Sequence, residues 1–418
     1  MEGNQRRKPE KAILAGLDAG VFSQAESATE ETLLELEALL ETAGGACVGR
    51  LLQSRMAPDP HSFLGEGKAE ELRQAVEATG ADMVIFDNEL SPSQIRSLEA
   101  ITGVTVMDRS ALILDIFAQR AKTREGRLQV ELAQYQYLLP RLSGMGASLS
   151  RQGGGIGTRC PGETRLETDR RHIRQRIAKL RQELTEVRRV RGVQRQLREK
   201  NSVPVVALVG YTNAGKSTLL NALTGAGIPA NNRLFDTLDT TTRRLTVSDT
   251  LEVLLSDTVG FIAKLPHHLV EAFQATLEEL QYADLLLHVI DASDPNREAH
   301  MAVVEQLAAQ LAPQGVPVIE VYNKADLTGA ENIPVGENKI AVSAASGTNL
   351  DGLLELIEKN LDTGVERLTL HLPYSAAGEL DRLHREAKVF SAEYENDGIR
   401  VDAALSRELQ GRYRAYIK

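Results

Sequence analysis

The sequence of 418 residues contains no tryptophan and only two cysteines, Cys47 and Cys160. Two cysteines cannot supply a disulfide framework or a cysteine-rich metal site, so neither feature is expected. Aromatic residues make up 4% of the chain, which argues against a protein that stacks bases on an aromatic sheet surface. No apolar run approaches the roughly 20 residues of a membrane-spanning helix, and the polar N-terminus is unlike a secretory signal. We therefore expect a cytoplasmic protein without a disulfide or a membrane span.

The length of the chain exceeds that of one ordinary hydrophobic core, which predicts two to four compact domains. The net charge is −10, but basic residues outnumber acidic ones between Arg165 and Lys200. A basic element on an acidic body is compatible with binding to phosphate groups, which the mean charge alone would argue against.

The first hundred residues alternate short apolar segments with amphipathic ones. Apolar runs at 12–17, 46–52, 82–87 and 104–108 predict strands, and the segments between them have helical periodicity and end at glycine. Alternating strands and helices indicate a parallel sheet covered by helices. Residues 1–109 are therefore expected to form an N-terminal parallel α/β domain.

Residues 110–200 are expected to form a helical hairpin. The pattern is helical from Ser110 to Leu142, and a glycine-rich loop follows at about 143–162. Beyond this loop, apolar residues at alternating spacings of four and three predict an antiparallel coiled coil with the first helix; they are Ile173, Ile177, Leu180, Leu184 and Val187. Arginines flank this seam, namely Arg170, Arg171, Arg174, Arg181, Arg188 and Arg189. A solvated helix with an idle loop is the alternative, and the polar run at 192–202 is interpreted as a linker.

Two more domains are expected after the hairpin. An α/β succession over 203–362 predicts a central, mostly parallel sheet. The last segment, 365–418, predicts a small α+β domain with a strand, a helix and two further strands. The turn Asn396-Asp397-Gly398 is expected to supply the positive φ of a tight hairpin. The predicted fold class is thus a multidomain α/β protein.

The run VVALVGYTNAGKSTLLNAL places an apolar strand, a loop of the form GxxxxGKS and an amphipathic helix in immediate succession. Gly210 and Gly215 allow backbone N–H groups to surround an anion, and the helix that follows directs its positive dipole end to the same point. Lys216 is then expected to reach the β- and γ-phosphates of a nucleotide, and the Ser217 hydroxyl to bind Mg²⁺. This context predicts a P-loop nucleotide site.

A second motif, Asp257-Thr258-Val259-Gly260, follows the apolar strand LEVLLSD. Its carboxylate would support the magnesium ion, and the Gly260 N–H would sense the γ-phosphate. A threonine between the two motifs is expected to close over the metal ion. Thr237 is our choice, and by chemistry alone its rivals are Thr240, Thr241 and Thr242.

The base is predicted by Asn323-Lys324-Ala325-Asp326, which follows the apolar run VPVIEVY. A carboxylate here can accept both N1–H and N2–H of guanine, whereas adenine offers no such pair of donors. Backbone N–H groups at Ser343-Ala344-Ala345 can bond the guanine oxygen. The order of these motifs predicts a domain that binds and hydrolyses GTP.

The residues that we assign to the nucleotide are Gly210, Tyr211, Thr212, Asn213, Ala214, Gly215, Lys216, Ser217, Thr218, Phe235, Asp236, Thr237, Leu238, Asp239, Asp257, Thr258, Val259, Gly260, Asn323, Lys324, Ala325, Asp326, Ser343, Ala344 and Ala345. Lys216, Thr237 and Gly260 are the expected catalytic residues, and Ser217, Thr237 and Asp257 the expected Mg²⁺ ligands. Phe261 stands where many related GTPases have a glutamine that positions water, so hydrolysis by the protein alone should be slow. GEGK at 65–68 lacks the GxxxxGK spacing, and a second nucleotide site is not predicted.

The sequence resembles the HflX-type GTPases of the Obg-related branch of P-loop GTPases. The resemblance extends over nearly the whole chain and rests on GYTNAGKSTLLNAL, LFDTLDTTTR, DTVGFI, NKAD, FLGEGKAEEL and PGETRLETDRR. On this family pattern the switch threonine falls on Thr237 and the hydrophobic replacement on Phe261. The chain departs from the pattern at Cys160, Arg165 and Asp236, none of which belongs to phosphate or base recognition.

The resemblance implies an α/β N-terminal domain, a helical hairpin, a GTPase domain and a short C-terminal domain. It also implies that the protein binds the large ribosomal subunit, contacts rRNA through the hairpin and its glycine-rich loop, and separates idle or stalled ribosomes, notably under heat stress. A monomer is expected, although no sequence feature determines the oligomeric state. Two alternatives stay open on the residues alone. One is a regulatory switch that docks proteins on its coiled coil, and the other is an RNA-remodelling nucleotidase that uses the N-terminal domain.

Overall fold

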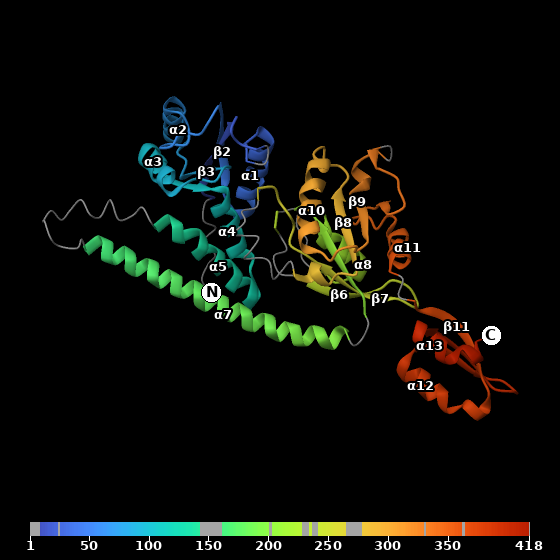
Figure 1. The fold of residues 1–418 in the computed structure, drawn as a ribbon. Coiled ribbons are helices and arrows are strands. Elements are labelled where there is room, and N and C mark those ends of the chain that lie inside the picture. Colours follow the sequence, from blue (N-terminus) through green and yellow to red (C-terminus); the bar gives the residue numbers. More distant parts are fainter. Residues whose placement is uncertain are drawn as a thin grey trace, which may run out of the picture.

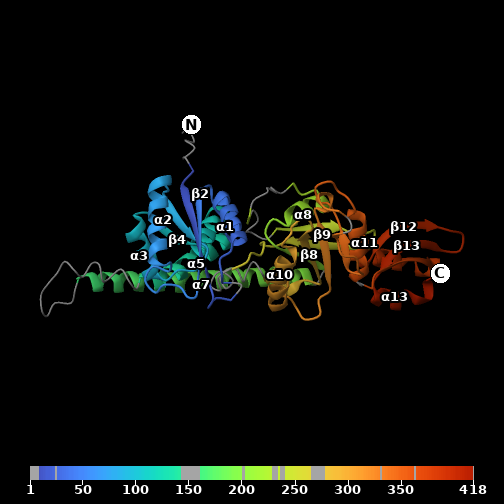
Figure 2. The ribbon, with the colours of Figure 1, turned by 90° about the horizontal axis from the view of Figure 1, so that it is seen from above.

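The protein is described here from a computed structural model. It describes residues 9–23, 26–142, 161–199, 203–227, 234–235, 241–264, 278–329, 332–361 and 364–417, with the side chains of 161–166, 188 and 190–199 left out. Four units follow one another along the chain, and the C-terminal unit lies at the far end from the N-terminal one (Figures 1 and 2). The predicted multidomain α/β architecture is confirmed.

The N-terminal unit is a four-stranded parallel sheet in the order β2-β1-β3-β4. Its elements are β1 (Lys11–Ala19), α1 (Glu30–Ala43), β2 (Ala46–Arg55), α2 (Glu66–Thr79), β3 (Met83–Phe86), α3 (Pro92–Thr102) and β4 (Thr105–Asp108). Thr29 and Ser91 begin α1 and α3 with capping boxes, which satisfy backbone N–H groups that lack helical partners. Left-handed glycines end the first three helices, as the sequence predicts.

The segment expected to be one helix after β4 consists of two, α4 (Arg109–Arg120) and α5 (Arg124–Arg141). Thr123 separates them because its side chain accepts a hydrogen bond from the Gly126 N–H and so begins a new helix. Helix α4 packs on α1 of the N-terminal sheet, whereas α5 packs on the long helix that follows. We therefore propose that the N-terminal domain extends to the end of α4.

The long helix α7 (Pro161–Glu199) lies against α5 and forms the hairpin (Figure 1). Ile177, Leu180 and Leu184 of α7 are buried with Leu128 and Leu132 of α5, which is the predicted seam. The linker expected from residue 192 onward is wrong, because α7 continues to Glu199. One glycine costs a helix only about 1 kcal/mol, and the surrounding Arg, Gln and Leu residues favour helix.

The third unit has a six-stranded sheet in the order β10-β9-β8-β5-β7-β6. Its elements are β5 (Val205–Gly210), α8 (Lys216–Thr224), β6 (Thr241–Thr246), β7 (Glu252–Asp257), η3 (Glu278–Tyr282), β8 (Leu285–Asp291), α10 (Arg297–Leu311), β9 (Val318–Asn323), η4 (Ala325–Leu327), β10 (Lys339–Ala341) and α11 (Leu350–Asn360). Only the pair β6–β7 is antiparallel, so the sheet is mostly parallel as predicted. The carboxyl ends of the parallel strands meet at one edge, where the predicted motifs begin.

The C-terminal unit is a three-stranded antiparallel sheet in the order β11-β13-β12 with helices on one face. Its elements are β11 (Glu366–Leu372), η6 (Tyr374–Ala376), α12 (Gly378–Glu386), β12 (Lys388–Tyr394), β13 (Ile399–Leu405), α13 (Arg407–Tyr413) and η7 (Arg414–Tyr416). The expected positive φ in the turn is wrong, since none of residues 396–398 has one. Gly398 is needed for a different reason, because a Cβ there would lie 2.5 Å from the backbone oxygen of Leu372.

Candidate functional site

The loop between β5 and α8 is shaped by its two glycines. Gly215 has φ 94°, a left-handed conformation, and a Cβ at that position would collide with the side chain of Asn323. A Cβ on Gly210 would likewise collide with the carbonyl oxygen of Val289 on β8. Both predicted glycines are thus required because neighbouring strands and loops approach them closely. The loop then leads directly into the first turn of α8.

Lys216 and Ser217 begin α8 at the point where the loop closes. The Lys216 ammonium is buried and donates to the carbonyl oxygens of Gly210 at 2.9 Å and Tyr211 at 2.8 Å. The Ser217 hydroxyl donates to Asp257 Oδ2 at 2.6 Å. A hydroxyl and a carboxylate side by side are oxygen donors of the kind that Mg²⁺ takes. The structure therefore brings together a buried ammonium group and two side-chain oxygen groups that lie 40 residues apart in sequence.

The segment Asp257–Phe261 lies directly over this loop. Thr258 anchors it by donating to the carbonyl oxygen of Leu208 at 2.6 Å. A Cβ on Gly260 would lie 2.9 Å from Thr212 Cα and 3.1 Å from Lys216 Nζ, so the main chain of Gly260 reaches the loop lysine only because it has no side chain. Two groups suited to a γ-phosphate, the Gly260 backbone and Lys216, consequently converge.

Phe261 follows Gly260 directly and is buried. It is 3% exposed, its N–H donates to the Gly210 oxygen at 3.1 Å, and its oxygen accepts from the Thr212 N–H at 2.7 Å. A buried phenyl ring cannot orient a water molecule through a hydrogen bond. The described residues thus offer no side chain at this position that activates water.

The two predicted base-binding loops are joined to the phosphate loop by Asn323. Its amide donates to the Ala214 oxygen at 2.9 Å, and its Oδ1 accepts from the Ala344 N–H at 3.0 Å. Asn323 is buried and has a framework role, whereas Asp326 in η4 is exposed and bonds to no other described residue. Asp326 is therefore the side chain of the motif that is available to a ligand.

The third predicted loop is Ser343-Ala344-Ala345, and two of its three backbone N–H groups already have acceptors in the protein. The Ser343 N–H donates to the Thr348 oxygen, and the Ala344 N–H donates to Asn323. Among the described residues, only the Ala345 N–H of these three has no acceptor within the protein. If this loop binds the guanine oxygen, Ala345 is the donor.

Some predicted residues lie outside the described part of the chain. They are Asp236, Thr237, Leu238 and Asp239. Phe235 is described and is buried edge-to-face against Phe117 of α4, with ring centroids 4.7 Å apart. Two of the rival threonines, Thr241 and Thr242, belong to strand β6, where Thr242 faces Ser256.

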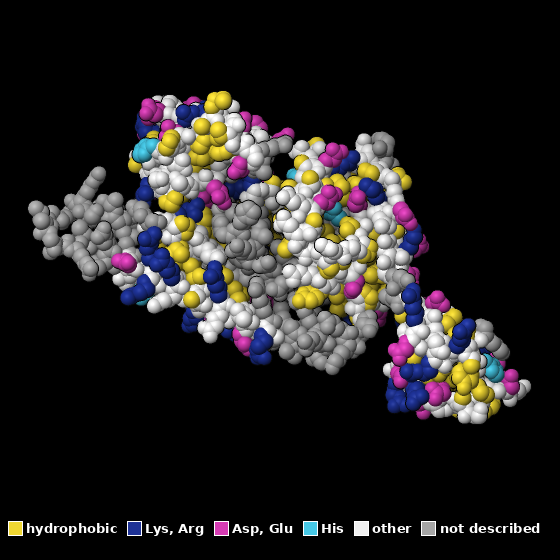
Figure 3. Space-filling model, in the orientation of Figure 1, with side chains coloured by type: hydrophobic (Ala, Val, Ile, Leu, Met, Phe, Trp, Pro, Cys, Tyr) yellow, Lys and Arg dark blue, Asp and Glu magenta, His cyan; other side chains and the backbone are white. Residues whose placement is uncertain are grey.

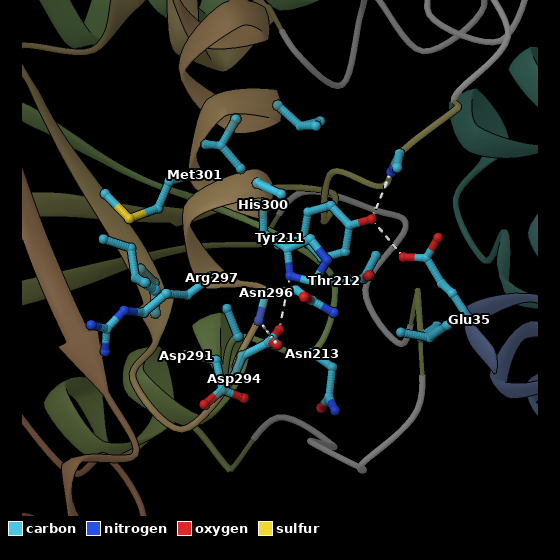
Figure 4. A pocket seen from close by; sticks show the side chains of 18 of the residues that line it. Glu35, Tyr211, Thr212, Asn213, Asp291, Asp294, Asn296, Arg297, His300 and Met301 are labelled. Atoms are coloured by element: carbon cyan, nitrogen blue, oxygen red, sulfur yellow. Dashed lines mark hydrogen bonds and ion pairs between the residues drawn. The ribbon is translucent and has the colours of Figure 1, made fainter. Parts of the chain in front are cut away.

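Tyr211 extends the site towards the N-terminal domain in a way that sequence reasoning missed. Its ring stacks on His300 of α10 at a centroid distance of 3.7 Å, and its hydroxyl donates to Glu35 of α1 at 2.5 Å (Figure 4). A cavity of about 360 Å³ separates α1 from α10 behind the loop. Burial and the adjacent Glu35 carboxylate raise the pKa of Tyr211, so the phenol stays protonated. No local sequence signal could have identified Glu35 as its partner.

The charge state of Lys216 should make nucleotide affinity depend on pH. Burial lowers the pKa of Lys216 to about 8, although the Asp257 carboxylate opposes this change. Phosphate groups favour the ammonium form, so above pH 8 the free protein must take up a proton when a nucleotide binds. We expect affinity for a GTP analogue to fall from pH 8 upward, by up to about tenfold per pH unit.

Calorimetry at pH 7 and pH 9, in two buffers of different ionisation enthalpy, measures both the affinity and the proton uptake. Equal affinities at the two pH values, with no proton taken up at pH 9, would contradict this assignment of Lys216.

The sheet order, the wrapped loop before α8 and the converging Lys216, Ser217 and Asp257 define a P-loop GTPase domain. Three family models match the chain, and they are described as GTP-binding GTPase N-terminal over residues 30–118, GTP-binding GTPase Middle Region over 120–198 and 50S ribosome-binding GTPase over 205–324.

Known proteins of similar sequence extend over nearly the whole chain. GTPase HflX of Caldanaerobacter subterraneus subsp. tengcongensis is 50% identical over 412 residues, which cover 98% of this chain and 94% of the relative. GTPase HflX of Escherichia coli strain K12 is 45% identical over 377 residues, 88% of each chain. A crystal structure of a GTP-binding protein from Sulfolobus solfataricus in complex with GDP has a TM-score of 0.44 and 23% identity, and covers 84% of this chain and 98% of that one.

The chain belongs to the HflX family of GTPases. It is accordingly an enzyme that binds guanine nucleotide and hydrolyses GTP, as the motifs predict. Within the described residues, no helix combines the length and the apolar character required to cross a membrane.

Proposed function

We propose that the protein, in its GTP-bound state, binds the large ribosomal subunit and separates idle or stalled ribosomes into subunits under stress. The observation that carries this proposal is the match of residues 205–324 to a family described as a 50S ribosome-binding GTPase. An rRNA partner requires a basic surface that is free to contact phosphates. The hairpin supplies such a surface.

Helix α7 presents several exposed arginines. Arg171, Arg174 and Arg181 are exposed and form no ion pair with the described residues, whereas Arg176 pairs with Glu131 of α5. Their spacing of i, i+3 and i+10 keeps them within one side of the helix. Figure 3 shows Lys and Arg side chains along the hairpin. Three guanidinium groups on one helix, without an ion-pair partner in the described part of the chain, suit the phosphate backbone of RNA.

The buried seam argues against the alternative in which proteins dock on the coiled coil. Leu180 is fully buried and Leu184 is 5% exposed, both against α5, so the apolar stripe of α7 is already occupied.

The GEGK segment likewise forms no anion loop, because Gly67 and Lys68 lie inside α2 and Lys68 pairs with Glu71. Neither feature supports a function other than the ribosomal one.

In the proposed reaction, the nucleotide residues are those assigned from the motifs. Lys216 and the Gly260 N–H hold the γ-phosphate, Asp326 and the Ala345 N–H hold guanine, and Asp257 keeps the Ser217 hydroxyl oriented. Ser217, Thr237 and Asp257 would hold Mg²⁺, which would supply positive charge next to the transferring phosphate. Because Phe261 cannot orient water, the protein alone hydrolyses GTP slowly. The ribosome accelerates the reaction by ordering the segments around the γ-phosphate, which in assisted GTPases gives roughly 10³ to 10⁵-fold.

Sedimentation of 70S ribosomes with the protein tests the proposal directly. With a non-hydrolysable GTP analogue, the protein should sediment with the large subunit and increase the free-subunit fraction, and with GDP it should do neither. The association constant should fall steeply between about 50 and 200 mM salt if several phosphates are contacted. The proposal fails if the analogue produces no association with the large subunit and no separation.

Two charge-reversal variants distinguish a specific contact made by the hairpin from a general effect of net charge. Arg174→Glu on α7 should weaken binding and reduce the salt slope by about 1. Lys359→Glu on α11, which changes the net charge equally and lies on the GTPase domain, should leave the slope unchanged. Equal effects of the two variants would show that α7 is not the contact.

A further inference from the structure

The segment that follows Gly260 is tied to two different domains. Phe261 is hydrogen-bonded to the phosphate loop, and the Ala263 N–H donates to the Tyr211 hydroxyl at 2.8 Å. Lys264 then leaves the GTPase domain, and its ammonium donates to the backbone oxygen of Ser27 at 2.7 Å and to Asp87. Ser27 and Asp87 belong to the N-terminal domain, so the position of this segment depends on that domain.

The acceptor of Lys264 lies at a distinctive place in the N-terminal sheet. Asp87 directly follows β3, and Ser27 precedes α1, which itself follows β1. Strand β1 lies between β2 and β3, so the helices that follow β1 and β3 diverge at this edge. Open α/β sheets take their ligands in such a crevice outside the carboxyl ends of the strands. Here the crevice contains a lysine from the GTPase domain.

The Lys264 contact is one part of a buried network that also includes the phosphate loop. Arg109 at the start of α4 is 2% exposed and pairs with both Asp87 and Glu35. Glu35 accepts from the Tyr211 hydroxyl, which in turn accepts from the Ala263 N–H. Two routes, Lys264–Asp87 and Ala263–Tyr211–Glu35, therefore meet at one arginine.

The backbone of Lys264 supports a holding role. Its φ is 57°, a left-handed conformation that a residue with a Cβ adopts only when its surroundings impose it. Without the contact to Asp87, the segment is expected to relax from this conformation. Gly260 is four residues away, and its approach to Lys216 would then depend only on the hydrogen bonds of Thr258 and of the Phe261 backbone.

We propose that Lys264 is a positioning residue for the γ-phosphate site, which holds Gly260 beside Lys216 as long as the N-terminal domain binds its ammonium. The proposal rests on the assignment of Lys216 and Gly260 to the γ-phosphate. GDP has no γ-phosphate, so the contact acts on the triphosphate alone. By reciprocity, a triphosphate in the site strengthens the contact between the two domains.

Binding of a fluorescent GTP analogue and of fluorescent GDP to the full chain, without ribosomes, tests this role. Lys264→Met should weaken GTP-analogue binding by about 5- to 20-fold, which lies within the ordinary range of coupling between two sites. It should change GDP binding by less than about twofold. Lys264→Arg, which keeps a donor cation for Asp87, should restore most of the analogue affinity. Lys359→Met, at an exposed lysine on α11, is the matched control and should change neither affinity.

Tyr211→Phe provides a second and milder route to the same result, because it removes only the hydroxyl that links Ala263 to Glu35. It should also lower the ratio of analogue to GDP affinity, and its effect should not add fully to that of Lys264→Met. The proposal is overturned if Lys264→Met lowers both affinities equally or raises analogue affinity. Unchanged affinities of Lys264→Met for both nucleotides would also overturn it. Failure of the native protein to bind ribosomes, with the expected affinity changes in this assay, would instead count against the proposed ribosomal function alone.

Discussion

Asp326→Asn is expected to remove the preference of the protein for guanine nucleotides. The carboxylate accepts two hydrogen bonds, from N1–H and N2–H of guanine, whereas an amide presents N–H groups to one of these donors. A site that leaves buried donors unpaired discriminates by on the order of 10⁴, so GTP affinity should fall by a factor approaching that value. Xanthosine triphosphate carries an oxygen at the position of the guanine amino group, and the Asp326→Asn variant should bind this nucleotide more tightly than the native protein does.

Competition among GTP, ATP and xanthosine triphosphate measures this change. Asp326 is exposed and has no partner among the described residues, so the substitution should not change the free energy of unfolding. Asp351→Asn, at an exposed position of α11, is the isosteric control. Unchanged preference for GTP over the other nucleotides in Asp326→Asn would remove the basis of the base assignment.

Lys216→Ala is expected to slow hydrolysis strongly and to weaken binding of the triphosphate. The ammonium is buried next to the carbonyl oxygens of Gly210 and Tyr211, where its charge is not screened by water. Loss of one such preorganised group typically lowers the rate by roughly 10² to 10³-fold. Single-turnover hydrolysis at saturating GTP separates the rate effect from the binding effect.

The same substitution should leave the fold intact at pH 7. Burial lowers the pKa of Lys216 to about 8, which means that folding opposes the charged form. The contribution of this group to the free energy of unfolding therefore rises with pH between about pH 8 and its ordinary pKa near 10.5. At pH 7 the alanine variant is therefore expected to unfold at a temperature no lower than the native protein. Turnover of GTP by Lys216→Ala at the native rate would refute the assignment.

The sequence predicts the framework of the nucleotide site well because its parts are local. A strand, a glycine-bearing loop and the first turn of a helix occupy 205–217 without interruption, so contiguous residues are sufficient to predict them. Helix ends at Gly44, Gly80 and Gly103 are local in the same sense. Errors arose where a local preference competed with a larger element, as at Gly192 inside α7.

Individual roles within the motifs were less accessible to sequence reasoning. Asn323 and Asp326 belong to one tetrapeptide, yet one crosslinks three loops and the other is free for a ligand. Gly398 was expected to supply a positive φ, and in the structure it permits the approach of β11. Such roles depend on which backbone lies opposite, which neither composition nor spacing reports.

By itself, the sequence determined that the chain carries a guanine-nucleotide site and a basic helical hairpin, since each is encoded by contiguous residues or by a regular period. Only the tertiary structure decided that Lys264 meets Asp87 and Tyr211 meets Glu35, partners separated by 177 and 176 residues. Charged side chains occur throughout the sequence, and their pairing follows from the packing of α1 and α4 against the GTPase domain. The physical reason is that a buried ion pair or side-chain hydrogen bond is selected by position and burial, and both are properties of the assembled domains.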